Sequence, residues 1–240
     1  RQIVSVANLL TAASPIVVIG GPGQGKTTLA WSLMSTADDR GLFPLYIDLQ
    51  RSSQDLQFEG SSYPRQSLVR QLILKELESL GVRTDAAQLD AIVASHGIAF
   101  LFDGLDVFPE RWQGEFLLDV GSRGWKSVPV VVLSRSSPAI YAACSSLNIG
   151  VLELESWDLA KSIKYTQDNL GSMSPARVAQ FLDAFEGDNG EHVPLILSLL
   201  RSSRYRKDVE AIPLFEIVRS TISAILSRDA ERSATWLLSE

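Results

Sequence analysis

The stretch Gly20-Gly21-Pro22-Gly23-Gln24-Gly25-Lys26-Thr27-Thr28 follows the apolar run Pro15–Gly20 and leads into a helical pattern, Lys26–Met34. It matches G-x-x-x-x-G-K-[ST], the spacing of a phosphate-binding loop between a strand and a helix. Glycines allow positive φ and a close approach of the backbone, so that successive N–H groups and the helix N-terminus converge on an anion. The sequence therefore predicts that residues 20–28 bind a polyphosphate.

Three side chains of this region and of a second apolar run predict a magnesium-bound nucleotide, ATP or ADP. Lys26 supplies a positive charge between the β- and γ-phosphates, and the Thr27 hydroxyl is placed to bind Mg²⁺. Asp103 ends the run Gly97–Asp103 and is predicted to hold the same Mg²⁺ through a bound water, because Mg²⁺ keeps much of its hydration shell. No residue distinguishes adenine from guanine.

Two further residues are candidates for catalysis. Asp106, three residues past Asp103, is predicted to be the general base that polarises an attacking water, or a loop carboxylate that only accepts backbone hydrogen bonds. Arg135 directly follows the run Val128–Ser134. Ligands of open α/β sheets bind beyond the carboxyl ends of the strands, so Arg135 is expected to contact the γ-phosphate, with a surface ion pair as the alternative.

Hydrophobic periodicity predicts an α/β fold. Short apolar runs alternate with the helical patterns Arg65–Leu80 and Pro109–Arg123, which is typical of a parallel sheet with crossover helices. Because the runs are apolar nearly throughout, both faces of every strand are expected to be buried. The five candidate strands are Pro15–Gly20, Phe43–Leu49, Gly97–Asp103, Val128–Ser134 and Ile149–Leu154.

The strand pattern stops near residue 155, which predicts two domains. Residues 1–155 form the α/β nucleotide-binding core, and residues 156–240 form a helical subdomain. The helical patterns of the second part are Asp158–Leu170, Pro175–Phe185, Val193–Arg201 and Leu214–Ser227.

Composition narrows the classes of function. Lys plus Arg number 22 against 28 Asp plus Glu, a net charge of −6, which disfavours general nucleic-acid binding. The single Cys144 cannot form an intrachain disulfide or a Cys-rich zinc site, which favours a reducing, cytoplasmic setting. No apolar run approaches the ~18 residues that a membrane span needs. The chain does not begin with Met, which suggests a fragment of a longer protein.

The motifs GGPGQGKTT, FLFDGLD, VVVLSR and HVPLILSLL together resemble the NACHT branch of the signal-transducing ATPases with numerous domains (STAND), over nearly the whole chain. The most telling residue is Gly104, because the broader AAA+ class usually has a glutamate directly after the magnesium-binding aspartate. The resemblance implies an ASCE-type P-loop core with strand order 5-1-4-3-2. It also implies that Arg135 is the first sensor and that Pro194 packs near the nucleotide base.

The same resemblance implies a function. ADP would hold the sheet and helical parts closed, and exchange for ATP would permit self-association, with effector and sensor modules outside this chain. Innate or antiphage defence is the expected setting. Asp106-Val107 stands where the family commonly has Asp-Glu, which implies slow hydrolysis.

Two other interpretations remain open. A work-performing ATPase acting on a polymer would use the same loop, although the acidic balance and Val107 argue against it. A scaffold could also use bound nucleotide for stability alone and never hydrolyse it. A small-molecule kinase is less favoured, because no second substrate pocket is evident in the sequence.

Overall fold

The computed structural model describes residues 5–11, 15–52, 67–95, 97–125, 128–155, 157–170, 174–183, 213, 215–220 and 223. The chain divides into two compact units: the first comprises residues 1–21 and 25–154, and the second comprises residues 22–24 together with the chain from Glu155 onward. In the second unit the described elements are α8 (Leu159–Leu170), α9 (Pro175–Asp183) and a helical stretch at 215–220. No helix among the described residues is long and apolar enough to span a membrane.

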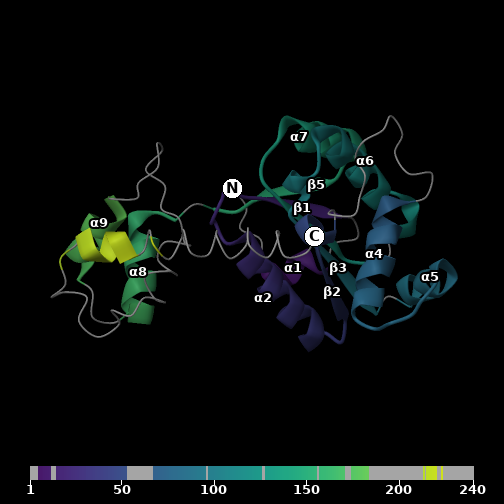
Figure 1. Cartoon of the computed structure of the whole chain (residues 1–240), viewed down its shortest axis with the longest axis horizontal. Helices are drawn as coiled ribbons and strands as arrows, with labels where there is room; N and C mark the ends of the chain where they lie inside the picture. Colours follow the sequence, from purple (N-terminus) through teal and green to yellow (C-terminus); the bar gives the residue numbers. More distant parts are fainter. Residues whose placement is uncertain are drawn as a thin grey trace. The chain divides into compact units, whose positions relative to one another are not determined.

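The first unit is built on a five-stranded sheet in which every neighbouring pair is parallel (Figure 1). The strand order is β2-β3-β4-β1-β5, which is the predicted 5-1-4-3-2 order read from the opposite edge. This confirms the predicted α/β fold. The strands are β1 (Ile16–Ile19), β2 (Phe43–Asp48), β3 (Ile98–Asp103), β4 (Val130–Ser134) and β5 (Gly150–Glu153).

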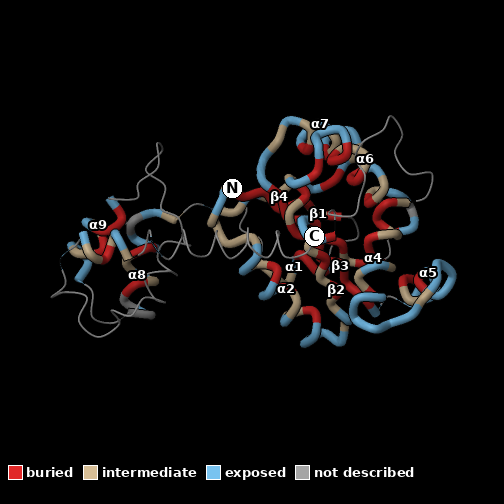
Figure 2. Tube along the Cα trace, in the orientation of Figure 1, coloured by how far each residue is buried: buried red, intermediate tan, exposed pale blue. Residues whose placement is uncertain are grey.

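Helices cover both faces of the sheet, each over its own apolar core. One core joins alternate strand residues such as Phe102 and Val132 to α4, α5, α6 and α7. The other joins the intervening residues, such as Leu101 and Leu133, to α1 and α2. Figure 2 shows the buried positions concentrated along the strands and the inner sides of these helices. The helices of the first unit are α1 (Val6–Leu9), α2 (Lys26–Asp39), α3 (Leu49–Ser52), α4 (Leu68–Ser79), α5 (Ala86–Ala94), α6 (Glu110–Val120) and α7 (Pro138–Leu147).

The two edge strands differ from the three central ones. All residues of β3 and β4 are buried. After an exposed first residue, β2 alternates between partly buried and buried positions, and β5 has no buried residue. The expectation that both faces of all five strands are buried is therefore wrong for the edges. An edge strand has one side without a hydrogen-bonded neighbour, which also explains why Pro44 is tolerated in β2.

Two helices of the first unit, α5 and α7, were not among the predicted crossovers. Asp85 and Gln88 form a capping box at the start of α5. Ser137 caps α7 by accepting a hydrogen bond from the Ile140 N–H, and Pro138 occupies its first turn. Such short helices depend on their end caps, because few internal hydrogen bonds stabilise them.

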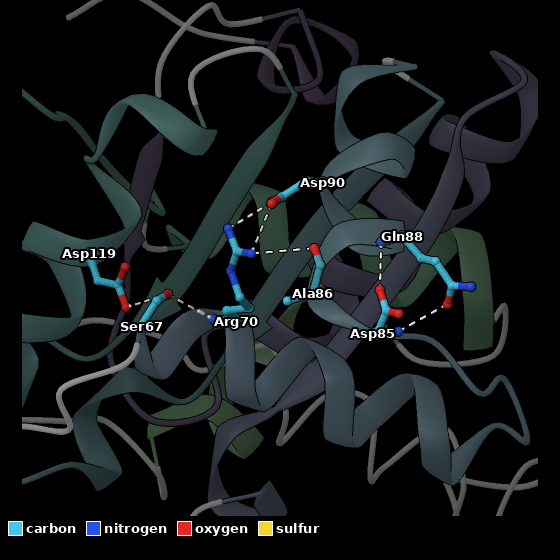
Figure 3. Close-up of polar contacts among 7 residues, drawn as sticks. All are labelled: Ser67, Arg70, Asp85, Ala86, Gln88, Asp90 and Asp119. Atoms are coloured by element: carbon cyan, nitrogen blue, oxygen red, sulfur yellow. Dashed lines mark hydrogen bonds and ion pairs between the residues drawn. The ribbon is translucent and has the colours of Figure 1, made fainter.

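Side chains of α4, α5 and α6 form a polar cluster that holds these helices together (Figure 3). Asp119 of α6 accepts hydrogen bonds from the Ser67 hydroxyl at 2.9 Å and the Val69 N–H at 3.0 Å, at the start of α4. Arg70 of α4 donates both terminal nitrogens to Asp90 of α5, at 3.0 and 2.7 Å. The cluster supplies a hydrogen-bond acceptor to an unpaired N–H group in the first turn of α4, and its ion pair links α4 to α5.

Candidate functional site

The predicted phosphate-binding loop lies between β1 and α2, at the carboxyl edge of the sheet. Its first residue is anchored to the sheet because the Gly20 N–H donates to the Ser134 carbonyl of β4 at 3.1 Å. Its last glycine, Gly25, is the N-cap of α2 with φ 97°, a left-handed conformation that side chains other than glycine rarely adopt. No side chain caps α2. The first-turn N–H groups are therefore not satisfied by a capping side chain, as an anion-binding helix end requires.

Lys26, the first residue of α2, points its ammonium group back over the loop. Nζ donates to the carbonyl oxygens of Gly20 at 2.6 Å and Gly21 at 2.9 Å. Burial lowers the pKa of Lys26, and the nearby Asp106 carboxylate opposes that shift. Within the described part of the chain Lys26 forms no ion pair. A half-buried ammonium that bonds only to carbonyls keeps its charge available for an anion.

Thr27 and Asp103 meet where the loop helix passes the end of β3. The Thr27 hydroxyl donates to Oδ2 of Asp103 at 2.9 Å, although the residues are 76 positions apart. A hydroxyl that donates its proton keeps its oxygen lone pairs free for a metal. Mg²⁺ prefers oxygen ligands and is commonly held by one or two protein groups together with substrate phosphates. The Thr27 and Asp103 oxygens fit that donor set.

Tyr46 of β2 also reaches Asp103, and sequence reasoning missed it. Its hydroxyl donates to the same Oδ2 atom at 3.1 Å, and its ring stacks on the exposed Trp31 of α2 with centroids 6.0 Å apart. Tyr46 lies two residues before Asp48, which pairs in register with Asp103. A polar aromatic residue near the end of the strand next to β3 was the available signal, but only the strand order makes it interpretable.

The charge on Asp103 is costly in the folded protein. Asp103 is only 9% exposed. The pKa of Asp103 is raised, with burial as the largest cause, although the hydrogen bonds from Thr27 and Tyr46 lower it. The neighbouring Asp48 carboxylate raises the same pKa further, and Lys26 acts in the opposite direction. A bound cation would relieve this penalty, because an opposite charge favours the ionised carboxylate.

The chain turns sharply after Asp103 and brings Asp106 to Arg135. Gly104 has φ 91° and precedes the single-turn 3₁₀ helix η1 (Leu105–Val107). Asp106 in η1 accepts a hydrogen bond from the Arg135 backbone N–H at 3.0 Å and pairs with its Nε at 3.2 Å. Both residues influence the pKa of Lys26 by charge. Lys26, Asp103, Asp106 and Arg135 thus gather at one edge of the sheet.

Of the remaining predicted site residues, four lie among the described residues and one does not. Pro22, Gly23, Gln24 and Thr28 belong to the loop and the first turn of α2. Pro194 lies outside the described residues, so its predicted packing against the nucleotide base stays a prediction.

Comparisons with known proteins identify the fold. No protein-family model matches the chain, and no curated protein matches its sequence. AMPPCP-bound DnaA from Aquifex aeolicus is 14% identical, with a TM-score of 0.50; the match covers 74% of this chain and 54% of DnaA. A chain of the HORMA:CdnC:Trip13 complex of E. coli MS115-1 is 14% identical, with a TM-score of 0.49; that match covers 88% of this chain and 74% of the other.

The matched part of this chain thus spans about half the length of DnaA. Together with the sheet order and the strand-loop-helix arrangement of β1 and α2, the likeness to DnaA shows that the chain has the P-loop NTPase fold.

Proposed function

We propose that this chain is an ATP- and ADP-binding switch of the NACHT and STAND type, with slow Mg²⁺-dependent hydrolysis. The observation that carries the proposal is the 2.9 Å contact between Thr27 and Asp103. It joins the loop that would hold phosphates to the strand end that would hold the metal. Lys26 would bind the β- and γ-phosphates, and Thr27 with Asp103 would hold Mg²⁺, which supplies charge neutralisation on the phosphates.

The conformation of Gly104 supports a switch over a motor. With φ 91°, this position disfavours any residue with a Cβ, by roughly 1–2 kcal/mol. A glutamate directly after Asp103, the catalytic base of work-performing relatives, would be strained here. Gly104 is also the most telling residue in the motif resemblance to NACHT proteins. Fast turnover is unnecessary for a switch, which needs about 10⁴-fold different affinities of its two states to move from nearly all off to nearly all on.

The assembly and biological setting extend this proposal. Exchange of ADP for ATP would alter the contacts of Arg135, and of Pro194 in the helical subdomain at 156–240, and so permit self-association. Effector and sensor modules outside this chain would convert assembly into a signal in a cytoplasmic, innate or antiphage defence setting. This setting is drawn from the motif resemblance of residues 20–28, 100–106, 130–135 and 192–200.

Calorimetry with Mg²⁺ and either ATP or ADP tests nucleotide binding. Wild-type chain is expected to bind both, and Lys26→Ala is expected to abolish binding because the loop loses its only side-chain cation. Lys164→Ala, which removes an exposed lysine of α8, is the matched control and should bind as wild type does. Unchanged affinity in Lys26→Ala would contradict the proposal.

Light scattering of the same samples separates the switch from its rivals. A switch assembles with ATP and not with ADP, and Lys26→Ala prevents assembly. Steady turnover stimulated by DNA or RNA would indicate a motor instead. Bound nucleotide that neither exchanges nor turns over, with assembly unaffected by Lys26→Ala, would indicate a scaffold.

A further inference from the structure

Both carboxylate oxygens of Asp106 are directed to one residue, Arg135. Oδ1 accepts from the Arg135 backbone N–H at 3.0 Å, and Oδ2 pairs with the side-chain Nε at 3.2 Å. In the described part of the chain no other group bonds to Asp106. A general base must place a carboxylate oxygen at the attacking water. Here the same two oxygens hold an arginine by its backbone and by its side chain.

Backbone hydrogen bonds hold the segments next to the Asp106–Arg135 contact in place. The Gly104 N–H donates to the Leu133 carbonyl of β4 at 3.0 Å, and the Val107 N–H donates to the Gly104 carbonyl at 3.1 Å. These bonds place η1 beside the end of β4, where Arg135 begins the next loop. The Asp106 side chain is 21% exposed, against 59% for Arg135. The carboxylate is thus the more enclosed and better anchored partner.

The pairing leaves the terminal nitrogens of the Arg135 guanidinium available. A guanidinium has five N–H donors, of which Nε carries one and the two terminal nitrogens carry four. The ion pair with Asp106 is made through Nε, and among the described residues the terminal nitrogens donate no hydrogen bond. Paired terminal N–H groups match the oxygens of a phosphate in a bidentate arrangement. Asp106 therefore restrains the arginine without consuming the groups that would bind an anion.

We infer that Asp106 is a positioning residue, which holds Arg135 ready for the γ-phosphate and so sets the preference for ATP over ADP, in place of the general base predicted from the sequence. The inference rests on the proposed nucleotide site. It makes Asp106 responsible for which nucleotide is recognised, and leaves its contribution to hydrolysis indirect, through Arg135.

A double-mutant cycle with Asp106→Ala and Arg135→Gln tests the inference on the whole chain, with Kd for ATP and for ADP measured by calorimetry in Mg²⁺. Asp106→Ala should weaken ATP about ten- to a hundredfold, the range for a lost hydrogen bond to a charged group, and change ADP little. In the Arg135→Gln background, the same substitution should have almost no further effect on ATP. Such non-additivity is the signature of one residue acting through another.

The control is Asp90→Ala, which breaks the comparable arginine pair of α4 and α5 and should leave both nucleotide affinities unchanged. If Asp106→Ala does not fold, Asp106→Asn is measured in the same cycle, because one amide oxygen cannot replace two carboxylate oxygens. A smaller but still Arg135-dependent loss of ATP affinity is expected for it.

Three outcomes overturn the inference or the proposal beneath it. Unchanged ATP affinity in Asp106→Ala, with slower single-turnover hydrolysis, would return Asp106 to the role of general base. An equal loss of ATP affinity with and without Arg135 would show that Asp106 acts independently. Wild-type chain that binds neither nucleotide would instead refute the proposed function itself, which separates the two failures.

Discussion

The Arg70–Asp90 pair and the Arg135–Asp106 pair use the same two side-chain types and leave different atoms available. Arg70 gives both terminal nitrogens to Asp90, and one of them also donates to the Ala86 carbonyl at 3.3 Å (Figure 3). Arg135 gives its backbone N–H and Nε to Asp106. In the first pair the terminal nitrogens of the guanidinium join two helices. In the second pair the contact to the carboxylate is made through the backbone N–H and Nε, so the terminal nitrogens stay available.

The same contrast extends to the carboxylates around each pair. Asp119 completes the hydrogen bonds of a helix start, at the half-buried junction of α4 and α6. Asp103 is buried beside Asp48, which raises its pKa, and its ionised form is stabilised mainly by two hydroxyl donors. Charges placed for stability are matched within the protein. A charge held against a desolvation cost marks a candidate ligand-binding group.

The largest effect that would test this contrast is expected from Asp103→Asn. The amide oxygen can still accept from Thr27 and Tyr46, but the charge for Mg²⁺ is lost. Nucleotide affinity should therefore become nearly independent of Mg²⁺, as measured by calorimetry with and without the metal. Asp90→Asn serves as the control, and a retained Mg²⁺ dependence in Asp103→Asn would remove Asp103 from the metal site.

The same variant should be more stable than wild type without ligand. Burial raises the pKa of Asp103 above the ordinary value of an aspartate, so the folded state binds this proton more tightly than the unfolded state does. The penalty is absent at pH below the unfolded value and is fully present above the raised folded value. Thermal melts above that window should show a higher melting temperature for Asp103→Asn, with the difference disappearing in acid. A lower melting temperature of Asp103→Asn at neutral pH would show that the buried charge of Asp103 does not destabilise the unliganded protein.

An intermediate effect is expected from Asp119→Ala, which should lower the stability of the protein and leave nucleotide affinity unchanged. The substitution leaves the Ser67 hydroxyl and the Val69 N–H without their acceptor, at a cost of about 1–3 kcal/mol in the free energy of unfolding. Denaturant unfolding measures the loss, and calorimetry on the same sample should show wild-type nucleotide affinity. A large change in nucleotide affinity at unchanged stability would show that the polar cluster of α4, α5 and α6 is not separate from the predicted nucleotide site.

The smallest effect is expected from Tyr46→Phe. It keeps the ring that stacks on Trp31 and removes one of two hydroxyl donors to Asp103. Losing one hydrogen bond, about 0.5–1.5 kcal/mol, should raise the Mg²⁺ concentration that half-saturates nucleotide binding by roughly two- to tenfold. Tyr141→Phe, which removes an exposed hydroxyl contact to Glu153, is the matched control. An unchanged Mg²⁺ requirement would make Tyr46 a packing residue only.

Much of the fold could be predicted from sequence, since its signals are consecutive in the chain. The apolar run before Gly20, the glycines and the helix from Lys26 are specified within about twenty positions, and the predicted strands fall close to the observed ones. The cap signals of α5 and α7 were equally local and were overlooked. Burial of the edge strands β2 and β5 was overestimated because a run of apolar residues does not reveal whether its strand has neighbours on both sides.

The candidate site was predictable as a set of residue types and only partly as a set of contacts. Asp103 and Arg135 could be expected at one edge because parallel strands end together. Their roles, and those of Lys26 and Thr27, stay predictions until nucleotide binding is measured. Asp106 shows the limit: its spacing from Asp103 suggested a base, whereas its partner Arg135 follows the end of β4, 29 residues later in the chain.

By itself, the sequence determined the glycine loop between β1 and α2, the alternation of strands with helices and the aspartate at the end of β3, because glycine conformations and hydrophobic periodicity act between near neighbours. Only the tertiary structure decided that Tyr46 shares an oxygen of Asp103 and that Asp106 holds Arg135. Hydrogen bonds of about 3 Å between residues far apart in the chain depend on which strands lie side by side. That choice belongs to the packing of the whole sheet, and no short stretch of the chain contains it.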